Sequence, residues 1–312
     1  MGKSVKPVQY GGQAVIEGVM MRGPRMYAIA VRLPNGQIDV TKQDISGWAS
    51  KPVFKWPVIR GCVALIDALI VGVKALTFSA NKALEEEENA ESTETIETET
   101  ATGKKNDELG WLEIVVTVGI ALVLGLVLFV GIPTASAHFL RGFVPQVVWQ
   151  NILEGFIRLG IFFLYILAIS RLKDIQRVFQ YHGAEHKVIF NHESGQPLSV
   201  ENARAFSRLH PRCGTSFLLL VVVVSIFVFA LLGLNPLWWR ILSRVLLMPL
   251  VAGIAYEWLK LTARHLDSPW LRWMIAGGLW LQRFTTREPD DAQLAVAIAA
   301  LNGVLESGQE LA

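Results

Sequence analysis

The residues from Tyr181 to Phe217 form a polar stretch between strongly apolar runs, and they include four of the six histidines and one of the two cysteines. The stretch opens with His182, Glu185 and His186 in the order H-x-x-E-H. On a helix, residues three and four apart share one face, with Cβ atoms about 5–6 Å apart. In inverted zincins this order supplies two zinc ligands and a general base. The pattern therefore predicts a metal site.

One arrangement of this site is catalytic. His182 and His186 come from one helix, and Glu257 lies in a later apolar block that is expected to end at the same side of the membrane. Two histidines and a carboxylate leave an open position on a zinc ion, as in catalytic zinc sites. Glu185 would then be the general base that activates water.

A second arrangement is structural. His210 and Cys213 form another pair with ligand-like spacing, and with His182 and His186 they would close a four-ligand zinc site. A third interpretation needs no metal, because these histidines could simply form hydrogen bonds at the rim of a helical bundle. Glu17 and Arg212 are further candidate site residues.

Composition indicates where these residues lie. The chain is 52% hydrophobic with a mean hydropathy of +0.39, and the apolar residues are concentrated in blocks. Blocks of about 20 apolar residues are typical of membrane-spanning helices. We therefore expect a mainly α, polytopic helical membrane protein with about four spans and a small cytosolic β-rich module at the N-terminus.

The expected segments follow from shifts in composition along the chain. They are a β-rich module (1–57), an amphipathic helix (58–84), an acidic disordered linker (85–109), spans one and two (110–170), a cytosolic motif loop (171–213), spans three and four (214–262), and an interfacial segment with a C-terminal helix (263–312). The linker assignment rests on ten acidic and two basic residues within 85–108.

The spans are expected at 111–132, 149–169, 216–234 and 239–261. Glu154 and Arg158 interrupt the second span, and their spacing favours a local ion pair near one interface over a buried functional charge. Because the spans hold few other polar residues, a transporter is the third choice of function.

Flanking segments carry weaker signals. Asn35-Gly36 between residues 27–33 and 37–42 predicts a hairpin, and Gly11-Gly12 ahead of it suits a tight turn or a close backbone approach. Glu17 is expected on a strand. Residues 58–80 carry Arg60, Asp67 and Lys74 on one helix face, which favours a helix on the membrane surface or packed against the bundle over a span.

Toward the C-terminus, residues 269–284 resemble an interfacial or re-entrant segment broken at Gly277-Gly278. A final helix is expected after Pro289. Its apolar stripe consists of Leu294, Ile298, Leu301 and Leu305.

Lysine and arginine counts predict the orientation. Thirteen precede the first span, the loop 134–148 has Arg141 alone, and the loop 171–213 has seven. Both termini and the motif loop are therefore expected in the cytoplasm.

Five blocks resemble a known family. The blocks GGQAVIEGVMMRGP (11–24), YHGAEHKVI (181–189), SRLHPRCGTSF (207–217), VAGIAYEWLKL (251–261) and LQRFTTREPDDAQLAVAIAAL (281–301) are similar to those of the YqhQ-like family of bacterial membrane proteins. The resemblance covers nearly all of the chain except the acidic linker. It implies a location in the bacterial inner membrane and a predicted metal-dependent enzyme, without a reaction or a substrate.

The sequence thus predicts a metal-dependent, hydrolytic reaction at the cytoplasmic membrane surface, with zinc as the expected divalent metal. The alternative is a non-enzymatic scaffold that docks anionic lipid or a cytosolic complex such as the ribosome. Its basic face would consist of Arg171, Lys173, Arg177, Lys187, Arg204, Arg208 and Arg212. The lipid bilayer is the expected partner in both cases, a homo-oligomer is an open alternative, and no specific nucleic-acid readout is expected.

Overall fold

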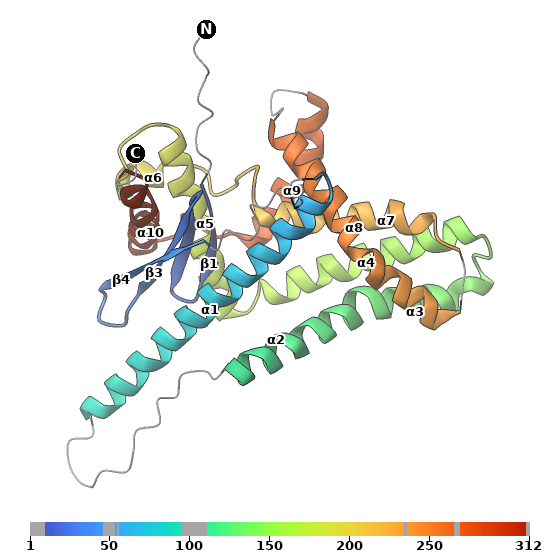
Figure 1. The fold of residues 1–312 in the computed structure, drawn as a ribbon, viewed down its shortest axis with the longest axis horizontal. Coiled ribbons are helices and arrows are strands. Elements are labelled where there is room, and N and C mark those ends of the chain that lie inside the picture. The colour runs from blue at the N-terminus through green and yellow to red at the C-terminus, as the bar shows by residue number, and fades with distance from the viewer. Residues whose placement is uncertain are drawn as a thin grey trace.

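The computed structural model describes residues 10–45, 54, 56–94, 111–233, 236–264 and 269–309. A small sheet with its covering helices lies at one end, and a bundle of apolar helices extends from it (Figure 1). The fold is therefore mainly helical with a small N-terminal sheet, as the sequence predicts.

The sheet has four antiparallel strands in the order β1-β2-β3-β4. They are β1 (Gly11–Val15), β2 (Gly18–Arg22), β3 (Met26–Arg32) and β4 (Ile38–Asp44). The predicted hairpin is confirmed: Arg32 pairs with Ile38, and Gly36 adopts φ 83° in the turn between them. Glu17 lies in the β1–β2 turn with φ 50°, so the expectation that it stands on a strand is wrong.

Helices cover both faces of the sheet. One face packs against α10 (Asp291–Gln309) and, at β1 and β2, against α5 (Lys173–Glu193), with the short α6 (Val200–Arg204) alongside these two helices. The other face packs against α1 (Ile59–Glu94) through Val71 and Ala75. Burial on both sides explains why β2 and β3 consist mostly of apolar residues.

The C-terminal helix agrees with the sequence pattern. Leu294 and Leu301 are buried in the core against the sheet, and Ile298 and Leu305 pack beside them. At its start, the amide of Gln293 donates to Asp290 Oδ1 (2.7 Å), and the amide of Asp290 donates to Gln293 Oε1 (2.9 Å). This reciprocal pair of hydrogen bonds is a capping box, so the acidic Asp290 serves as the N-terminal cap of α10.

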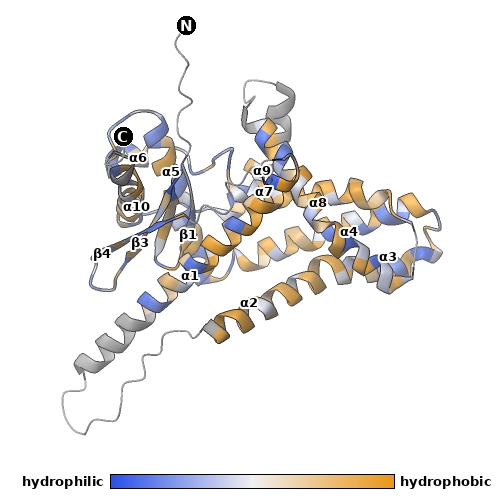
Figure 2. Ribbon diagram, in the orientation of Figure 1, coloured by the Kyte–Doolittle hydropathy of each residue, from blue (hydrophilic) through white to orange (hydrophobic). Residues whose placement is uncertain are grey.

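The bundle is built from apolar helices (Figure 2). They are α2 (Trp111–Leu126), the π-helical turn η3 (Val127–Gly131), α3 (Ile132–Phe139), the 3-10 turn η4 (Leu140–Gly142), α4 (Val147–Ile169), α7 (Gly214–Ala230), α8 (Leu237–Arg264) and α9 (Pro269–Thr285). Helix α7 is central, because it packs against α4, α8 and α9.

Within the described residues, four helices are long and apolar enough to cross a membrane, which indicates a membrane protein. They are Ile59–Ala83, Leu112–Gly142, Val147–Ile169 and Leu237–Thr262.

The membership of this set differs from the prediction at two places. Helix α7 has 17 residues and falls short of the length, because the chain turns after Ala230 ahead of Gly233 and Pro236. Helix α1, expected to lie on or beside the bundle, meets the criteria for a span. It also packs against α8, and two of its three heptad-spaced charged residues form ion pairs within the protein: Asp67 pairs with Arg22 and Arg60 pairs with Glu257.

Three expected boundaries move. The first apolar block continues as helix through η3 and α3, so most of the expected loop 134–148 is helical. Helix α1 runs to Glu94, into the expected linker, and residues 95–109 of that linker lie outside the described residues. The expected break at Gly277-Gly278 is wrong, because α9 is continuous there; a Cβ on Gly278 would lie 2.4 Å from Ser216 Oγ, so this glycine serves helix packing.

Candidate metal centre

Helix α5 positions the two motif histidines. His182 and His186 lie one turn apart on this helix, and their ring centroids are 4.5 Å apart. The prediction that the H-x-x-E-H residues lie on a helix is therefore confirmed.

Cys213 completes a group of three ligand-type side chains. It is the N-cap of α7, where its Sγ accepts from the amide of Thr215 (3.4 Å), and it lies 3.1 Å from His182 Nε2. One ligand atom from each of His182, His186 and Cys213 lies within 4.8 Å of the others. Cys213 lies 31 positions after His182 and 27 positions after His186, so side chains distant in the sequence meet at one point.

Both imidazoles are oriented by backbone carbonyls. His182 Nδ1 is 2.8 Å from the carbonyl oxygen of Thr285, and His186 Nδ1 is 2.6 Å from that of Arg208. A carbonyl oxygen only accepts, so each Nδ1 carries the proton and each Nε2 keeps its lone pair. This is the tautomer in which a metal-binding histidine is usually held.

The carbonyl of Thr285 is available for a local reason. Helix α9 ends at this residue, and the residue four positions later is Pro289, which has no amide to donate. Glycine at position 183 lets the segment 285–289 pack close to α5, because a Cβ on Gly183 would lie 2.1 Å from the carbonyl oxygen of Arg287. The amide of Arg287 in turn donates to the carbonyl of Phe179 (2.8 Å).

These residues fit a zinc-type ion. Imidazole nitrogen and thiolate sulfur are the donors that zinc prefers, and three protein ligands are the number found at catalytic zinc sites. Carbonyl contacts behind both histidines match the supporting hydrogen bonds of known metal centres.

His210 stands beside this group without joining it. Its ring centroid is 5.5 Å from that of His186, and its Nε2 is 3.8 Å from a carboxylate oxygen of Glu193. Burial lowers the pKa of His210, although the Glu193 carboxylate acts in the opposite direction. Gln282 fixes the backbone here, accepting from the amide of His210 and donating to its carbonyl, each at 2.8 Å.

Glu185 is turned toward the sheet. Its carboxylate is buried and accepts from the backbone of Gly12, and a Cβ on Gly12 would lie 3.0 Å from Glu185 Cγ. Glycine therefore lets β1 approach α5, as the close-approach interpretation of Gly11-Gly12 expects. Burial raises the pKa of Glu185, and the neighbouring His182 and the Gly12 contact oppose that rise.

The other candidate residues are paired elsewhere. Glu257 forms an ion pair with Arg60 on α1, and Arg212 forms one with Glu193. Neither residue belongs to the His182–His186–Cys213 group.

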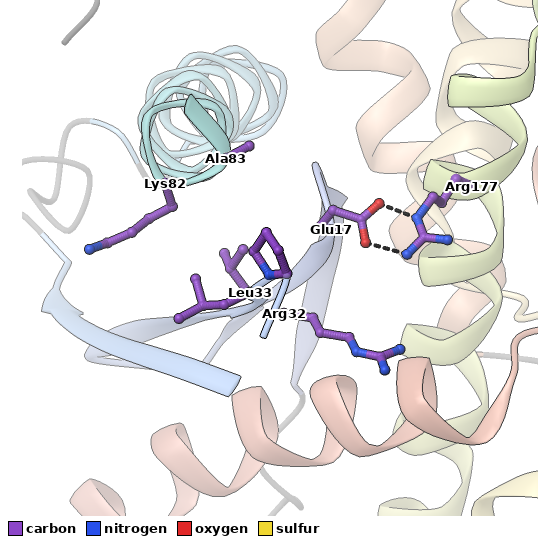
Figure 3. A pocket seen from close by; sticks show the side chains of 8 residues that line it. Glu17, Arg32, Leu33, Lys82, Ala83 and Arg177 are labelled. Carbon is purple, nitrogen blue, oxygen red and sulfur yellow. Dashed lines mark hydrogen bonds and ion pairs between the residues drawn. The ribbon is translucent and has the colours of Figure 1, made fainter. Parts of the chain in front are cut away.

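Glu17 pairs with Arg177, and Figure 3 shows the two side chains directed toward each other; both residues line a cavity of about 380 Å³. Its carboxylate also accepts from the hydroxyl of Tyr181 (3.2 Å). Burial, together with this carboxylate, raises the pKa of Tyr181. The structure therefore gives Glu17 a role in tying the β1–β2 turn to α5.

The described residues thus form a mainly helical protein with four helices long and apolar enough to cross a membrane, in which a small antiparallel sheet and a His-His-Cys group adjoin the bundle. Residues 56–307 match the family described as "Protein of unknown function (DUF1385)". The chain is also 39% identical over 308 residues to "Uncharacterized protein YqhQ" of Bacillus subtilis (strain 168), covering 98% of this chain and 95% of that protein. The chain belongs to this YqhQ-like family. No solved structure matches it significantly.

Proposed function

We propose that this protein is a metal-dependent membrane enzyme whose divalent ion, of the zinc type, is held by His182, His186 and Cys213. The observation that supports this most is the pair of carbonyl contacts to the Nδ1 atoms, which leaves both Nε2 lone pairs available next to the cysteine sulfur. A merely structural histidine pair needs no such matched orientation.

The ligand count favours catalysis over a closed site. His210, the fourth ligand of the structural alternative, lies outside the group and is held by Glu193 and by Gln282. Three protein ligands leave one position for a water or a substrate oxygen. A zinc ion held by His182, His186 and Cys213 would supply an electrophile that polarises a carbonyl or phosphoryl oxygen and makes water nucleophilic near neutral pH. The expected reaction class is hydrolysis.

Glu185 remains the candidate general base. The H-x-x-E-H order gives it this role in inverted zincins, and it lies on α5 between His182 and His186. In this structure the Glu185 carboxylate faces Gly12 of β1. As the base, Glu185 would accept the proton of the attacking water, and the hydrogen bond from the backbone of Gly12 would position its carboxylate.

The proposed side of the membrane is the cytoplasm. The segment 171–213, which carries all three residues of the group, has seven lysines and arginines, whereas the turn between η4 and α4 has none. Both termini are proposed to lie on the same side as the group, in a bacterial inner membrane.

The scaffold alternative is less well supported by the contacts. A docking surface for anionic lipid or a ribosome needs unpaired basic side chains, but most of the seven form internal ion pairs. The pairs are Arg177–Glu17, Lys187–Glu288, Arg204–Asp291, Arg208–Glu288 and Arg212–Glu193.

Metal content tests the proposal directly. We expect the purified full-length protein to contain about one equivalent of zinc, and His182→Ala and Cys213→Ser to lose most of it, because two ligands rarely retain zinc. Cys62→Ser is the matched control: this cysteine lies on α1 outside the group, with its Sγ near the carbonyl of Pro249, and its variant should keep the metal. Full occupancy in the Cys213→Ser variant would contradict the assignment.

A second variant separates enzyme from structural metal site. Glu185→Gln keeps the size of the side chain and its capacity to accept from Gly12, but removes the carboxylate. We expect metal content and melting temperature near those of the wild type, and a failure to complement a deletion strain. If the Glu185→Gln variant complements as well as the wild type, Glu185 is not the general base, and the metal site would be structural.

A further inference from the structure

The helical bundle contains a second cluster of charged side chains, which the proposed metal site does not use. It consists of Glu154 and Arg158 on α4 and of Arg240 and Arg244 on α8. Each of these four residues is at most 2% exposed. Helix α3 and the first turns of α4 and α8 lie at the end of the bundle far from the sheet (Figure 1). The ion pair expected near an interface is therefore part of a larger, buried cluster.

Glu154 is shared by all three arginines. Its carboxylate accepts from Arg158 (2.9 Å), Arg240 (3.0 Å) and Arg244 (2.8 Å). It also accepts from the hydroxyl of Thr134 on α3 (3.0 Å). With a second bond from Arg244 Nη2 (3.0 Å), the carboxylate accepts from five donors, and its single negative charge can balance only one of the three guanidinium groups.

Neutral groups satisfy much of the rest. Arg158 Nε donates to the carbonyl of Phe129 (2.8 Å), and Arg244 Nη2 donates to Asn151 Oδ1 (3.0 Å). The ring of Phe229 lies beneath both guanidinium groups, at 5.0 Å from Arg158 and 5.6 Å from Arg244. These contacts orient the arginines but do not cancel their charge.

The cluster carries a formal charge of +2. Three arginines pair with one glutamate, and among the described residues no other acidic side chain forms an ion pair with them. Arginine does not lose its proton in proteins, so the charge cannot be removed by titration. An uncompensated charge inside an apolar helical bundle is strongly unfavourable. A counter-anion would remove that cost.

Two buried polar atoms at this end of the bundle have no hydrogen-bond partner and would be available to such a group. Arg240 Nε has no hydrogen-bond partner although the residue is 1% exposed. Gln150, one helical turn before Glu154, is fully buried, and its Oε1 is also without a partner. Its amide nitrogen donates to the carbonyl of Ala137 (2.8 Å), which fixes the side chain between α3 and α4.

We propose that the Glu154–Arg158–Arg240–Arg244 cluster binds a phosphate-type oxyanion, with Arg240 Nε as a direct donor. Planar guanidinium groups match the oxygens of such an anion, and a protonated phosphate oxygen would donate to Gln150 Oε1. Trp149 and Trp238 flank the cluster in the sequence and are exposed, as at a membrane interface. The phosphate can therefore belong to a lipid headgroup or be free inorganic phosphate.

Copurification distinguishes these sources, because a ligand buried among these side chains should exchange slowly. The full-length protein is purified in phosphate-free detergent buffer and examined by native mass spectrometry and by phosphorus analysis. A retained phospholipid adduct identifies the lipid headgroup. An inorganic phosphate adduct, or a rise in melting temperature of about 3 °C or more when phosphate is added, identifies the free anion. Absence of all three signals would overturn the proposal.

Variants test the assignment to this cluster. Arg240→Gln should abolish the adduct or the phosphate-dependent shift, whereas Arg141→Gln, which changes an exposed arginine at the same end of the bundle, should retain it. If Arg240→Gln does not fold, Gln150→Glu replaces it: an internal carboxylate should take the place of the anion and make the melting temperature independent of phosphate. Retention of the ligand by either of these cluster variants, or its loss in Arg141→Gln, would place the anion elsewhere.

Discussion

At the residue scale, the candidate site depends as much on backbone carbonyls as on the side chains of the motif. The sequence pattern predicts His182 and His186, and the ligand-like spacing of His210 and Cys213 points to Cys213. The sequence does not predict that the carbonyls of Thr285 and Arg208 contact the histidines, because every residue type carries the same backbone acceptor. The one trace of the Thr285 contact is Pro289, whose missing amide leaves that carbonyl without a helical partner.

Gly183 gives a test of this backbone support. A Cβ at this position would lie 2.1 Å from the carbonyl oxygen of Arg287, so Gly183→Ala must displace the segment that carries Thr285. We expect metal affinity to fall by about 10-fold or more, the usual cost of losing support behind a ligand, and the melting temperature to fall as well. Competition with a chelator and thermal denaturation measure the two effects.

The matched control is Gly214→Ala. This glycine follows Cys213 directly, and a Cβ on it would meet nothing within 4 Å. It should leave metal affinity and melting temperature close to those of the wild type. Equal effects of the two substitutions would show that the approach of the 285–289 segment does not support the site.

At the element scale, helix packing explains several differences between expectation and structure. A pair of glycines in a Trp-rich segment suggests a break, because glycine weakens an isolated helix. In α9 the pair is instead a contact surface, where Gly278 lets the helix approach Ser216 on α7. Similarly, the heptad-spaced charges of α1 suggest a face in water, whereas two of them form ion pairs with other elements: Asp67 is buried beside Arg22, and Arg60 is partly buried beside Glu257.

The two glycines of α9 allow a paired prediction. Gly278→Ala would place its Cβ 2.4 Å from Ser216 Oγ and 2.7 Å from Ser216 Cβ, so α7 and α9 must separate. We expect the free energy of unfolding to fall by about 1–3 kcal/mol, as for other overpacked positions. Gly277→Ala meets only Leu219 Cδ2 at 3.6 Å, and its higher helix propensity should stabilise the protein by up to about 1 kcal/mol. Melting temperatures of the two variants in the same detergent test this, and a lower value for Gly277→Ala than for Gly278→Ala would contradict it.

At the scale of the whole molecule, the sheet module and the bundle meet at the candidate metal centre. Helix α5 belongs to the core of the sheet module, whereas Cys213 begins α7, the central helix of the bundle. Fold class, the four-stranded sheet's hairpin and the C-terminal helix follow from local patterns in the sequence. The buried arginine cluster does not, since its members come from α4 and α8, and only their packing brings Glu154 to Arg240 and Arg244.

This arrangement makes orientation decisive, because a site at the junction faces the compartment of the sheet module. Two exposed glutamines on opposite sides of the predicted membrane report it: Gln146, just before α4, and Gln196, after α5. We expect Gln146→Cys to react with a membrane-impermeant thiol reagent in intact cells, and Gln196→Cys to react only after permeabilisation. Cys62→Ser serves as the background, and labelling of that parent, in which the buried Cys213 is retained, is subtracted. Labelling of Gln196→Cys in intact cells with protection of Gln146→Cys would place the His182–His186–Cys213 group outside the cytoplasm, where an enzyme acting on cytosolic substrates could not function.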